Sequence, residues 1–167
     1  MTTLYTETPS PLGALLLTAD DGALTGVHFP GQKHDRPPQP DWQRADDEPV
    51  LAAARAQLTE YFDGRRAGFD LPLAPHGTSF QRAVWQALLS VPFGATSTYG
   101  AVAAAIGRPS AVRAVGAAIG ANPIGIIVPC HRIIGRDGTL TGYAGGLERK
   151  AKLLALESRA SQLELTA

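Results

Sequence analysis

The chain has a single cysteine, Cys130, among its 167 residues, and this count limits how the fold can be held together. A lone thiol can form neither an internal disulfide nor a multi-cysteine zinc site. The fold must therefore rest on a hydrophobic core, and 44% of the residues are hydrophobic, enough for one domain or two small ones. Any chemistry at Cys130 is that of a single nucleophile.

The neighbours of Cys130 are those of a reactive thiol. The run Pro129-Cys130-His131-Arg132 follows an apolar segment, residues 124–128, and places a histidine directly after the cysteine. A nucleophilic cysteine needs such a base close by. Free cysteines are also among the most buried residue types and often act as small hydrophobes, so the pair alone leaves both interpretations open.

Charge is divided unevenly along the chain although the total is zero. Residues 1–76 carry six Lys or Arg against eleven Asp or Glu, whereas residues 77–157 carry eight against three. The second half is therefore suited to polyanions, although a solvated basic face has the same composition. The sequence has no run of 18 apolar residues and no signal-peptide pattern, so we expect a soluble cytoplasmic protein.

The first half has the turn spacing of a small antiparallel meander. Apolar or β-rich runs at residues 4–6, 15–17 and 24–29 are separated by Pro/Gly and Asp/Gly turns. Residues 30–49 have no apolar period and are predicted to form a surface loop. An amphipathic helix is predicted from Pro49 to Gly64.

The second half is predicted to be mostly helical. A capping-box pattern at residues 78–81 precedes a first helix, and a short helix is expected from about Thr98 to Ile106, stopped by Gly107. A further helix is expected from an N-cap at Ser110 through Ile119. Its buried face is predicted to carry Val112, Val115 and Ile119.

The opposite face of this last helix is small, with Arg113 standing among Gly116, Ala117 and Gly120. Each glycine costs roughly 1 kcal/mol in a helix interior relative to alanine, so a close neighbour is expected. A helix with side chains is about 10–12 Å across, whereas the minor groove of B-DNA is about 6 Å wide. Either another helix packs here, or this face enters a groove.

Seven motifs between residues 78 and 157 occur together. They are Phe80-Gln81-Arg82-Ala83-Val84-Trp85, Pro92-Phe93-Gly94 through Tyr99-Gly100, Arg113-Ala114-Val115-Gly116, Asn122-Pro123, Ile127-Val128-Pro129-Cys130-His131-Arg132, Gly142-Tyr143-Ala144-Gly145-Gly146-Leu147, and Lys150 through Glu157. In this order and spacing the chain resembles the 6-O-alkylguanine-DNA alkyltransferases, the methylated-DNA–protein-cysteine methyltransferases.

The resemblance implies direct repair of DNA. The alkyl group on oxygen 6 of guanine, or oxygen 4 of thymine, moves irreversibly to the cysteine, here Cys130, so each molecule reacts once. A free thiol with a pKa near 8.5 is only a few per cent thiolate at neutral pH. In the family the next histidine, here His131, is the base through a water molecule, and a carboxylate, here Glu157, orients it. Asn122 matches a residue that stabilises the active-site turn.

The resemblance also implies that a nucleotide is rotated out of the duplex, which costs a few kcal/mol. Arg113 matches the residue that fills the vacated space, and Tyr99 matches one that contacts a phosphate. Gly100 and Gly116 are expected at the DNA surface. Arg136 lies in a loop that contacts the DNA backbone in relatives.

The substrate-binding groups implied by the resemblance are Tyr143, the main-chain amide of Ala144, and Ile133. A proton delivered by Tyr143 and a bond donated near oxygen 6 would make guanine a better leaving group. Many relatives carry serine where Ala144 stands, and we expect little loss because the implied contact uses the main chain.

The resemblance is weaker in the first half. Some relatives bind zinc there, but this sequence has no cysteine before position 130, so we expect no metal and no cofactor. His28, His34 and His76 are expected to be loop or surface residues. The expected partner is alkylated double-stranded DNA, without a membrane, and the expected state is a monomer that is able to cluster on DNA.

The expected fold is α/β of the α+β type, in two domains. Residues 1–76 form a small antiparallel sheet with a helix, and residues 77–167 form a mostly helical DNA-binding and active-site domain with a helix-turn-helix. Two other functions stay open. A hydrolase using Cys130, His131 and Glu157 would turn over through an acyl-enzyme, and a non-catalytic sensor of alkylated DNA would bind without transfer.

Overall fold

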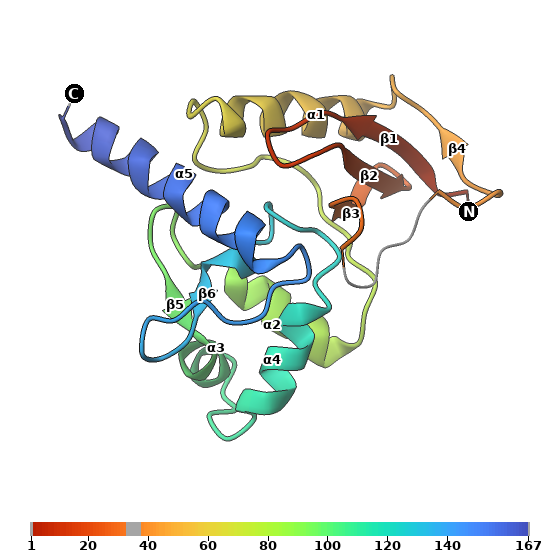
Figure 1. Cartoon of the computed structure of the whole chain (residues 1–167). Coiled ribbons are helices and arrows are strands. Elements are labelled where there is room, and N and C mark those ends of the chain that lie inside the picture. The colour runs from red at the N-terminus through yellow and green to blue at the C-terminus, as the bar shows by residue number, and fades with distance from the viewer. Residues whose placement is uncertain (1, 33–37, 167) are drawn as a thin grey trace.

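The N-terminal strands form the predicted antiparallel meander (Figure 1). The computed structural model describes residues 2–32 and 38–166. In it, β1 (Leu4–Thr8), β2 (Leu15–Asp20) and β3 (Ala23–His28) pair in chain order. The hairpin between β2 and β3 turns through Asp21 and Gly22, both with positive φ. This is the backbone that an Asp-Gly pair favours in a two-residue hairpin loop.

A fourth strand corrects the prediction of a loop throughout residues 30–49. β4 (Gln43–Arg44) pairs in parallel with β1, so the sheet order is β3-β2-β1-β4. The N–H of Gln43 donates to the carbonyl of Thr3, and the N–H of Ala45 donates to the carbonyl of Tyr5. Main-chain bonding therefore adds this polar segment to the sheet without any apolar period in its sequence.

Helix α1 (Pro49–Phe62) packs on the sheet, as its amphipathic pattern predicted (Figure 1). The side chain of Glu48 caps the first turn of the helix by accepting a hydrogen bond from the N–H of Leu51. Pro49 is the first helical residue, a position whose N–H has no partner within the helix, so no hydrogen bond is lost there. Its buried residues are Val50, Leu51, Ala54, Leu58 and Tyr61. Tyr61 is the largest of them, and the sequence prediction did not include it.

The second half is mostly helical, as predicted. Its elements are α2 (Ser79–Leu88), β5 (Ser97–Thr98), α3 (Tyr99–Ala105), α4 (Val112–Gly120), the 3-10 turn η1 (Cys130–Arg132), β6 (Ile133–Ile134) and α5 (Leu147–Thr166). Both parts of the capping box at Thr78 and Gln81 are present, and Thr98 caps α3. The consecutive helices α3 and α4 pack together and on α2, which gives the expected helix-turn-helix. The α/β prediction is confirmed.

The start of α4 differs from the prediction. A turn closed by the N–H of Ala111 on the carbonyl of Arg108 delays the helix, so Ala111 rather than Ser110 stands at the N-cap, without a side-chain bond. Val112 therefore lies in the first turn and is 40% exposed, not buried. The buried residues of α4 are Val115, Ala118 and Ile119.

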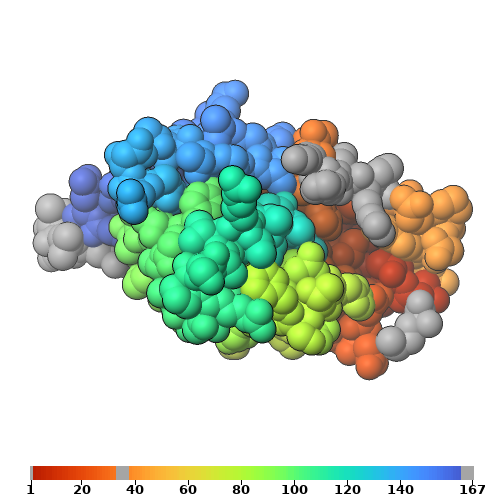
Figure 2. All heavy atoms as spheres, turned by 90° about the horizontal axis from the view of Figure 1, so that it is seen from below, coloured from red at the N-terminus to blue at the C-terminus, as the bar shows by residue number. Residues whose placement is uncertain are grey.

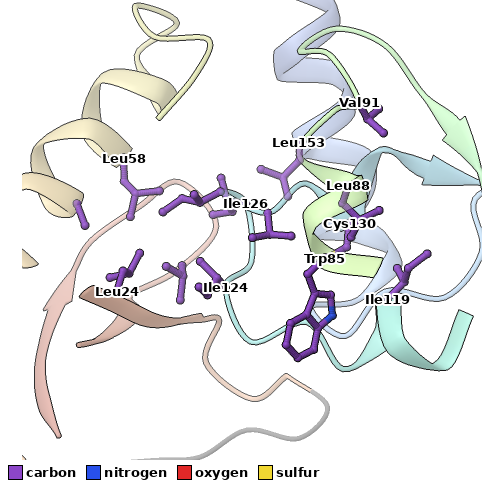
Figure 3. Packing of buried hydrophobic residues seen from close by; sticks show 14 of the residues in the cluster. Leu24, Leu58, Trp85, Leu88, Val91, Ile119, Ile124, Ile126, Cys130 and Leu153 are labelled. Atoms are coloured by element: carbon purple, nitrogen blue, oxygen red, sulfur yellow. The ribbon is translucent and has the colours of Figure 1, made fainter. Parts of the chain in front are cut away.

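The core runs through both halves of the chain (Figure 3). Leu24 and Leu58 come from the sheet and α1, Trp85 and Leu88 come from α2, and the apolar segment 124–128 lies between the two groups. Val27 of β3 forms a parallel bridge with Ile124, so this segment is joined to the sheet by main-chain bonds as well. The segment leads directly to the cysteine, which is thereby held by both halves.

The histidines of the first half lie partly as expected. His76 is exposed and contacts Asp20, with 3.2 Å between its Nε2 and the carboxylate. His28 is not a loop residue, because the pairing of β3 with β2 continues as far as the pair Leu16 and His28, and it is half-buried. His34 lies outside the described residues. Within the described part of the chain, no helix is long and apolar enough to cross a membrane.

Candidate active site

Cys130 is the first residue of η1 and is 7% exposed. Asn122 supports it from the preceding loop. Its Nδ2 donates to the carbonyl of Val128 at 2.9 Å and to the Sγ of Cys130 at 3.2 Å, while its Oδ1 accepts from the N–H of Ile124 at 3.0 Å. One buried amide thus closes the loop and contacts the thiol, which fits the turn-stabilising role that the resemblance implied.

The loop that carries the thiol is held against the sheet. The N–H of Val27 donates to the carbonyl of Pro123, and the N–H of Gly125 donates to the carbonyl of Val27. Ile126 has a φ of 69°, a left-handed conformation that is costly for a β-branched residue. Ile126 is almost fully buried, so the packing of its side chain in the core offsets this cost.

His131 and Glu157 form a buried pair. Nε2 of His131 lies 2.7 Å from Oε2 of Glu157, and the two side chains are 0% and 1% exposed. Arg132 donates from Nε to Oε1 of the same carboxylate at 2.8 Å and from Nη2 to Oε2 at 3.1 Å. Its Nη1 donates to the carbonyl of Val91 at 2.7 Å. Glu157 is therefore a buried residue of α5 and not a surface glutamate of that helix.

A further donor reaches this carboxylate from the first half of the chain. The hydroxyl of Tyr61 on α1 donates to Oε2 of Glu157 at 2.6 Å. Burial alone would raise the pKa of the Glu157 carboxyl, but the bonds from His131, Arg132 and Tyr61 lower it to about 2. Glu157 is therefore ionised at neutral pH although it is buried.

His131 is neutral at neutral pH for the opposite reason. Burial lowers the pKa of its imidazole, and the bond to Glu157 offsets only part of that shift. Since Nε2 faces the carboxylate, the proton of the neutral ring belongs there, and Nδ1 is left as an acceptor. Among the described residues, Nδ1 has no hydrogen-bond partner and is buried. This nitrogen can take a proton, and the ionised Glu157 then stabilises the imidazolium.

The thiol of Cys130 is protonated at rest. Burial raises its pKa, while the bond from Asn122 and the charge of Lys150 act against this shift. Lys150 of α5 is itself buried, and its Nζ donates to the carbonyls of Ile133 and Thr141. A proton must therefore leave the sulfur when it reacts, and His131, the next residue, is a neutral base.

Tyr143 and Ala144 lie beside this centre in the loop before α5, both half-buried. The ring of Tyr143 packs edge-on against Phe29, and the guanidinium of Arg149 lies 4.9 Å from the centroid of Phe29. Burial, and then the proximity of Cys130, raise the pKa of the Tyr143 hydroxyl, so it keeps its proton. Ile133 is fully buried in β6, where its side chain belongs to the core.

The predicted DNA residues lie on the surface of the helix-turn-helix and the loop after β6. Seen from below, α3 and α4 share one face of the molecule (Figure 2). Arg113, Gly100 and Arg136 are exposed, and no hydrogen bond or ion pair to another described residue holds Arg113. Tyr99 is half-buried, and its hydroxyl lies 2.9 Å from Oγ1 of Thr141 in the loop before α5.

The two glycines of α4 have different surroundings. A Cβ at Gly116 would meet the ring of Tyr99 at 3.7 Å, which is ordinary contact with α3. A Cβ at Gly120 would meet nothing within 4 Å of it among the described residues. Helix packing therefore explains at most Gly116, and the rest of the small face is open to the outside.

The sequence did not single out three side chains that build this site. Arg132 and Lys150 stand in motifs of the resemblance, which was the only signal for them, because no local pattern indicates that these two cations are buried. Tyr61 gave no local signal, because it contacts Glu157 only through the fold. The hydrogen bond between them joins residues that are 96 positions apart in the sequence.

Two family models match this chain, one in each half. The model described as "6-O-methylguanine DNA methyltransferase, DNA binding domain" matches residues 79–159, and the one described as the "ribonuclease-like domain" of the same protein matches residues 3–75. The chain belongs to the 6-O-methylguanine DNA methyltransferase family, which confirms the resemblance seen in the sequence.

Two relatives show how far the similarity extends. The methylated-DNA–protein-cysteine methyltransferase of Haemophilus influenzae is 50% identical over 159 residues, which cover 94% of this chain and 88% of the relative. That of Mycolicibacterium paratuberculosis is 47% identical over 162 residues, 97% and 96% of the two chains. Among solved structures, Mycobacterium tuberculosis OGT in complex with DNA has a TM-score of 0.87 and 45% identity, with 94% of each chain covered.

Proposed function

We propose that the protein is a methylated-DNA–protein-cysteine S-methyltransferase. It removes the alkyl group from 6-O-alkylguanine, and from 4-O-alkylthymine, by a single irreversible transfer to Cys130. The observation that carries this proposal is the buried contact of Asn122 with Cys130 beside a neutral His131 that is bonded to an ionised Glu157. The chain that holds these residues belongs to the 6-O-methylguanine DNA methyltransferase family. A relative that is 50% identical carries the name methylated-DNA–protein-cysteine methyltransferase.

The proposed reaction begins with the thiol proton. It passes through a water molecule to Nδ1 of His131, and Glu157 stabilises the imidazolium across 2.7 Å. The sulfur attacks the alkyl carbon, so an S–C bond forms while the C–O6 bond breaks and its electron pair stays on the base. The hydroxyl of Tyr143 gives its proton to the departing guanine and is reprotonated from the solvent, to which the His131 imidazolium releases the proton of the thiol, and the amide of Ala144 donates to oxygen 6.

Single use follows from the bond that is formed. To regenerate the thiol, water would have to attack the alkyl carbon and expel the Cys130 thiolate, which is a poor leaving group from a saturated carbon. A hydrolase would instead need a thioester intermediate that Cys130 could release. We therefore propose one alkyl group per molecule and no turnover.

We propose that the open face of α4 enters the minor groove. Arg113 replaces the rotated nucleotide, Tyr99 contacts the adjacent phosphate, Gly100 and Gly116 allow the backbone to come close, and Arg136 contacts the DNA backbone from its loop. The exposure of this face and its small side chains support the proposal. Residues 1–76 and 77–167 act as the two domains, and the protein works in the cytoplasm as a monomer on double-stranded DNA.

The proposal is tested with duplex DNA that carries one 6-O-methylguanine. Wild-type protein should restore the guanine, and Cys130→Ser should bind the same duplex with similar affinity but leave the lesion in place. A serine variant that repaired the lesion would overturn the assignment of the nucleophile. Cys130→Ser failing to bind would instead show that the sulfur is needed for the fold or for docking.

A further inference from the structure

Tyr61 belongs to the half of the chain that carries none of the proposed reacting groups. It is the penultimate residue of α1, it is fully buried, and its hydroxyl donates to Oε2 of Glu157 at 2.6 Å. The same oxygen accepts from His131 at 2.7 Å and from Arg132 at 3.1 Å. Tyr61 and His131 therefore share one carboxylate oxygen.

The ring of Tyr61 is fixed by its neighbours, so the hydroxyl has little freedom to leave the carboxylate. Phe62 and Phe93 pack edge-on against it at centroid distances of 5.2 and 6.2 Å, and Phe69 is tilted at 5.5 Å. Burial, followed by the charge of Glu157, raises the pKa of Tyr61. The group therefore donates a proton to this bond at every pH at which the protein works.

A donor on Oε2 changes what Glu157 does for His131. Each hydrogen bond to a carboxylate oxygen disperses its negative charge and makes it a weaker partner for a second donor. Without the Tyr61 hydroxyl, the charge on Oε2 would act more strongly on His131 and would favour the imidazolium in the resting protein. A base that is already protonated cannot take the proton of Cys130.

We propose that Tyr61 is a positioning residue of the alkyl-transfer site, through which the N-terminal half holds Glu157 in place and keeps His131 neutral before the reaction. This inference rests on the proposed function. It assigns a role in the reaction to a part of the chain that otherwise contributes only scaffold.

The experiment below measures how the transfer rate depends on pH, and every charged or titratable group near His131 affects the protonation of its imidazole. The charged or titratable side chains near it are Tyr61 from α1, Cys130 and Arg132 from η1, Tyr143 from the loop before α5, and Lys150 and Glu157 from α5. Arg132 and Lys150 both disfavour the imidazolium, and only Glu157 favours it. Removing the hydroxyl alters the one group that raises the affinity of His131 for a proton.

The test uses Tyr61→Phe, which keeps the ring, and measures single-turnover methyl transfer between pH 5 and 9. Loss of a hydrogen bond to a charged group should reduce the rate at pH 7 by roughly tenfold. The midpoint of the acid limb should also move up, by about half a pH unit or more. Titration of the His131 imidazole by NMR in the same variant should show the same upward shift without depending on activity.

Two controls separate this role from stability. Leu51→Val trims another buried side chain of α1 and leaves the Tyr61 hydroxyl and its surrounding rings unchanged, and Tyr5→Phe removes a hydroxyl from β1, far from the site in the fold. Both should keep the wild-type midpoint, whatever Leu51→Val does to thermal stability. A Tyr61→Phe profile with an unchanged midpoint, even at a lower rate, would overturn the proposal. Wild-type and Tyr5→Phe proteins that gain no methyl group would refute the proposed function instead.

Discussion

At the scale of single residues, the site combines a histidine that burial keeps neutral with a glutamate that hydrogen bonds keep ionised. Burial alone disfavours charge on each group and would leave both neutral. Three donors around Glu157 reverse its preference, whereas one acceptor does not reverse that of His131. The result is a base with an oriented counter-charge in a buried site.

This arrangement predicts how stability depends on pH. The pKa of Glu157 is about 2 in the folded protein against an ordinary 4.5, so its contribution is present above pH 4.5 and is lost as the pH falls towards 2. The difference corresponds to about 3 kcal/mol. His131, whose folded pKa is lowered, also contributes above its ordinary pKa of about 6.5 and loses this contribution at lower pH.

The measurement is urea unfolding at pH 7, 5 and 3 for wild type and Glu157→Gln. The variant should be less stable at pH 7 by about 3–5 kcal/mol, because Arg132 stays buried without its counter-charge. It should also lack the part of the acid loss that belongs to Glu157. Glu148→Gln, an exposed change on the same helix, serves as the control and should unfold like wild type at each pH. Equal acid losses in all three proteins would contradict the assignment.

Replacing Asn122 should lower both the methyl-transfer rate and the stability of the fold. Asn122→Ala leaves the carbonyl of Val128 and the N–H of Ile124 without this partner, which should cost about 1–3 kcal/mol of unfolding free energy. It also removes the donor to Sγ, so the methyl-transfer rate should fall roughly 10- to 100-fold.

Gln57→Ala is the matched control for Asn122→Ala. Gln57 closes a loop in the same way, with two bonds to the main chain of Asp70, but it is only half-buried and lies on α1. It should lose less stability and keep the wild-type rate per folded molecule. If both variants kept that rate, the contact between Asn122 and the thiol would have no role in the reaction.

At the scale of elements, α4 shows which structural features can be predicted from a short stretch of sequence. Its small outer face and its buried Val115 and Ile119 follow from helical spacing alone, as does the capping box of α2. Its start was misplaced because Ser110 is a good capping residue by type, whereas the turn between Arg108 and Ala111 decides where the helix begins.

The partners of Glu157 show what the sequence alone does not specify. Cys130, His131 and Glu157 were found through the resemblance, and the structure brings the last two together. The donation from Tyr61 depends on how α1 packs against α5, and no local pattern encodes a contact between residues 96 positions apart. Similarly, β4 joins the sheet through main-chain bonds, which any polar sequence can make.

The exposed arginine of α4 gives a prediction at this scale. Arg113→Ala should slow methyl transfer from duplex DNA by about 10- to 100-fold, because rotating a nucleotide out of the stack costs a few kcal/mol that Arg113 would offset. Reaction with free benzylguanine should change little, since no duplex has to open. Arg65→Ala, an exposed arginine of the acidic half, should match wild type on both substrates. Equal losses on both substrates would give Arg113 a structural role.

At the scale of the whole molecule, a continuous core joins an acidic half to a basic one. The segment 124–128 lies between the two, with Ile124 bridged to Val27 of the sheet and Cys130 two residues beyond its end (Figure 3). In the proposed function the basic half faces DNA, and the acidic half supports the site from behind.

This division of charge predicts that DNA binding weakens with salt, because neutralised phosphates release counterions. The slope of log K against log salt concentration should become shallower by about 1 in Arg136→Ala, if Arg136 contacts one phosphate. Arg65→Ala on the acidic half should leave the slope unchanged. Binding that did not depend on salt would contradict a basic docking face.

The central claim is that one sulfur accepts one alkyl group and keeps it. The most direct measurement is mass spectrometry of the protein after incubation with excess duplex DNA that carries 6-O-methylguanine. We predict the addition of one methyl group per molecule, located on the peptide that contains Cys130, and an equal number of lesions removed. Protein recovered without added mass after the lesions have been repaired, or more lesions repaired than protein molecules present, would contradict the account.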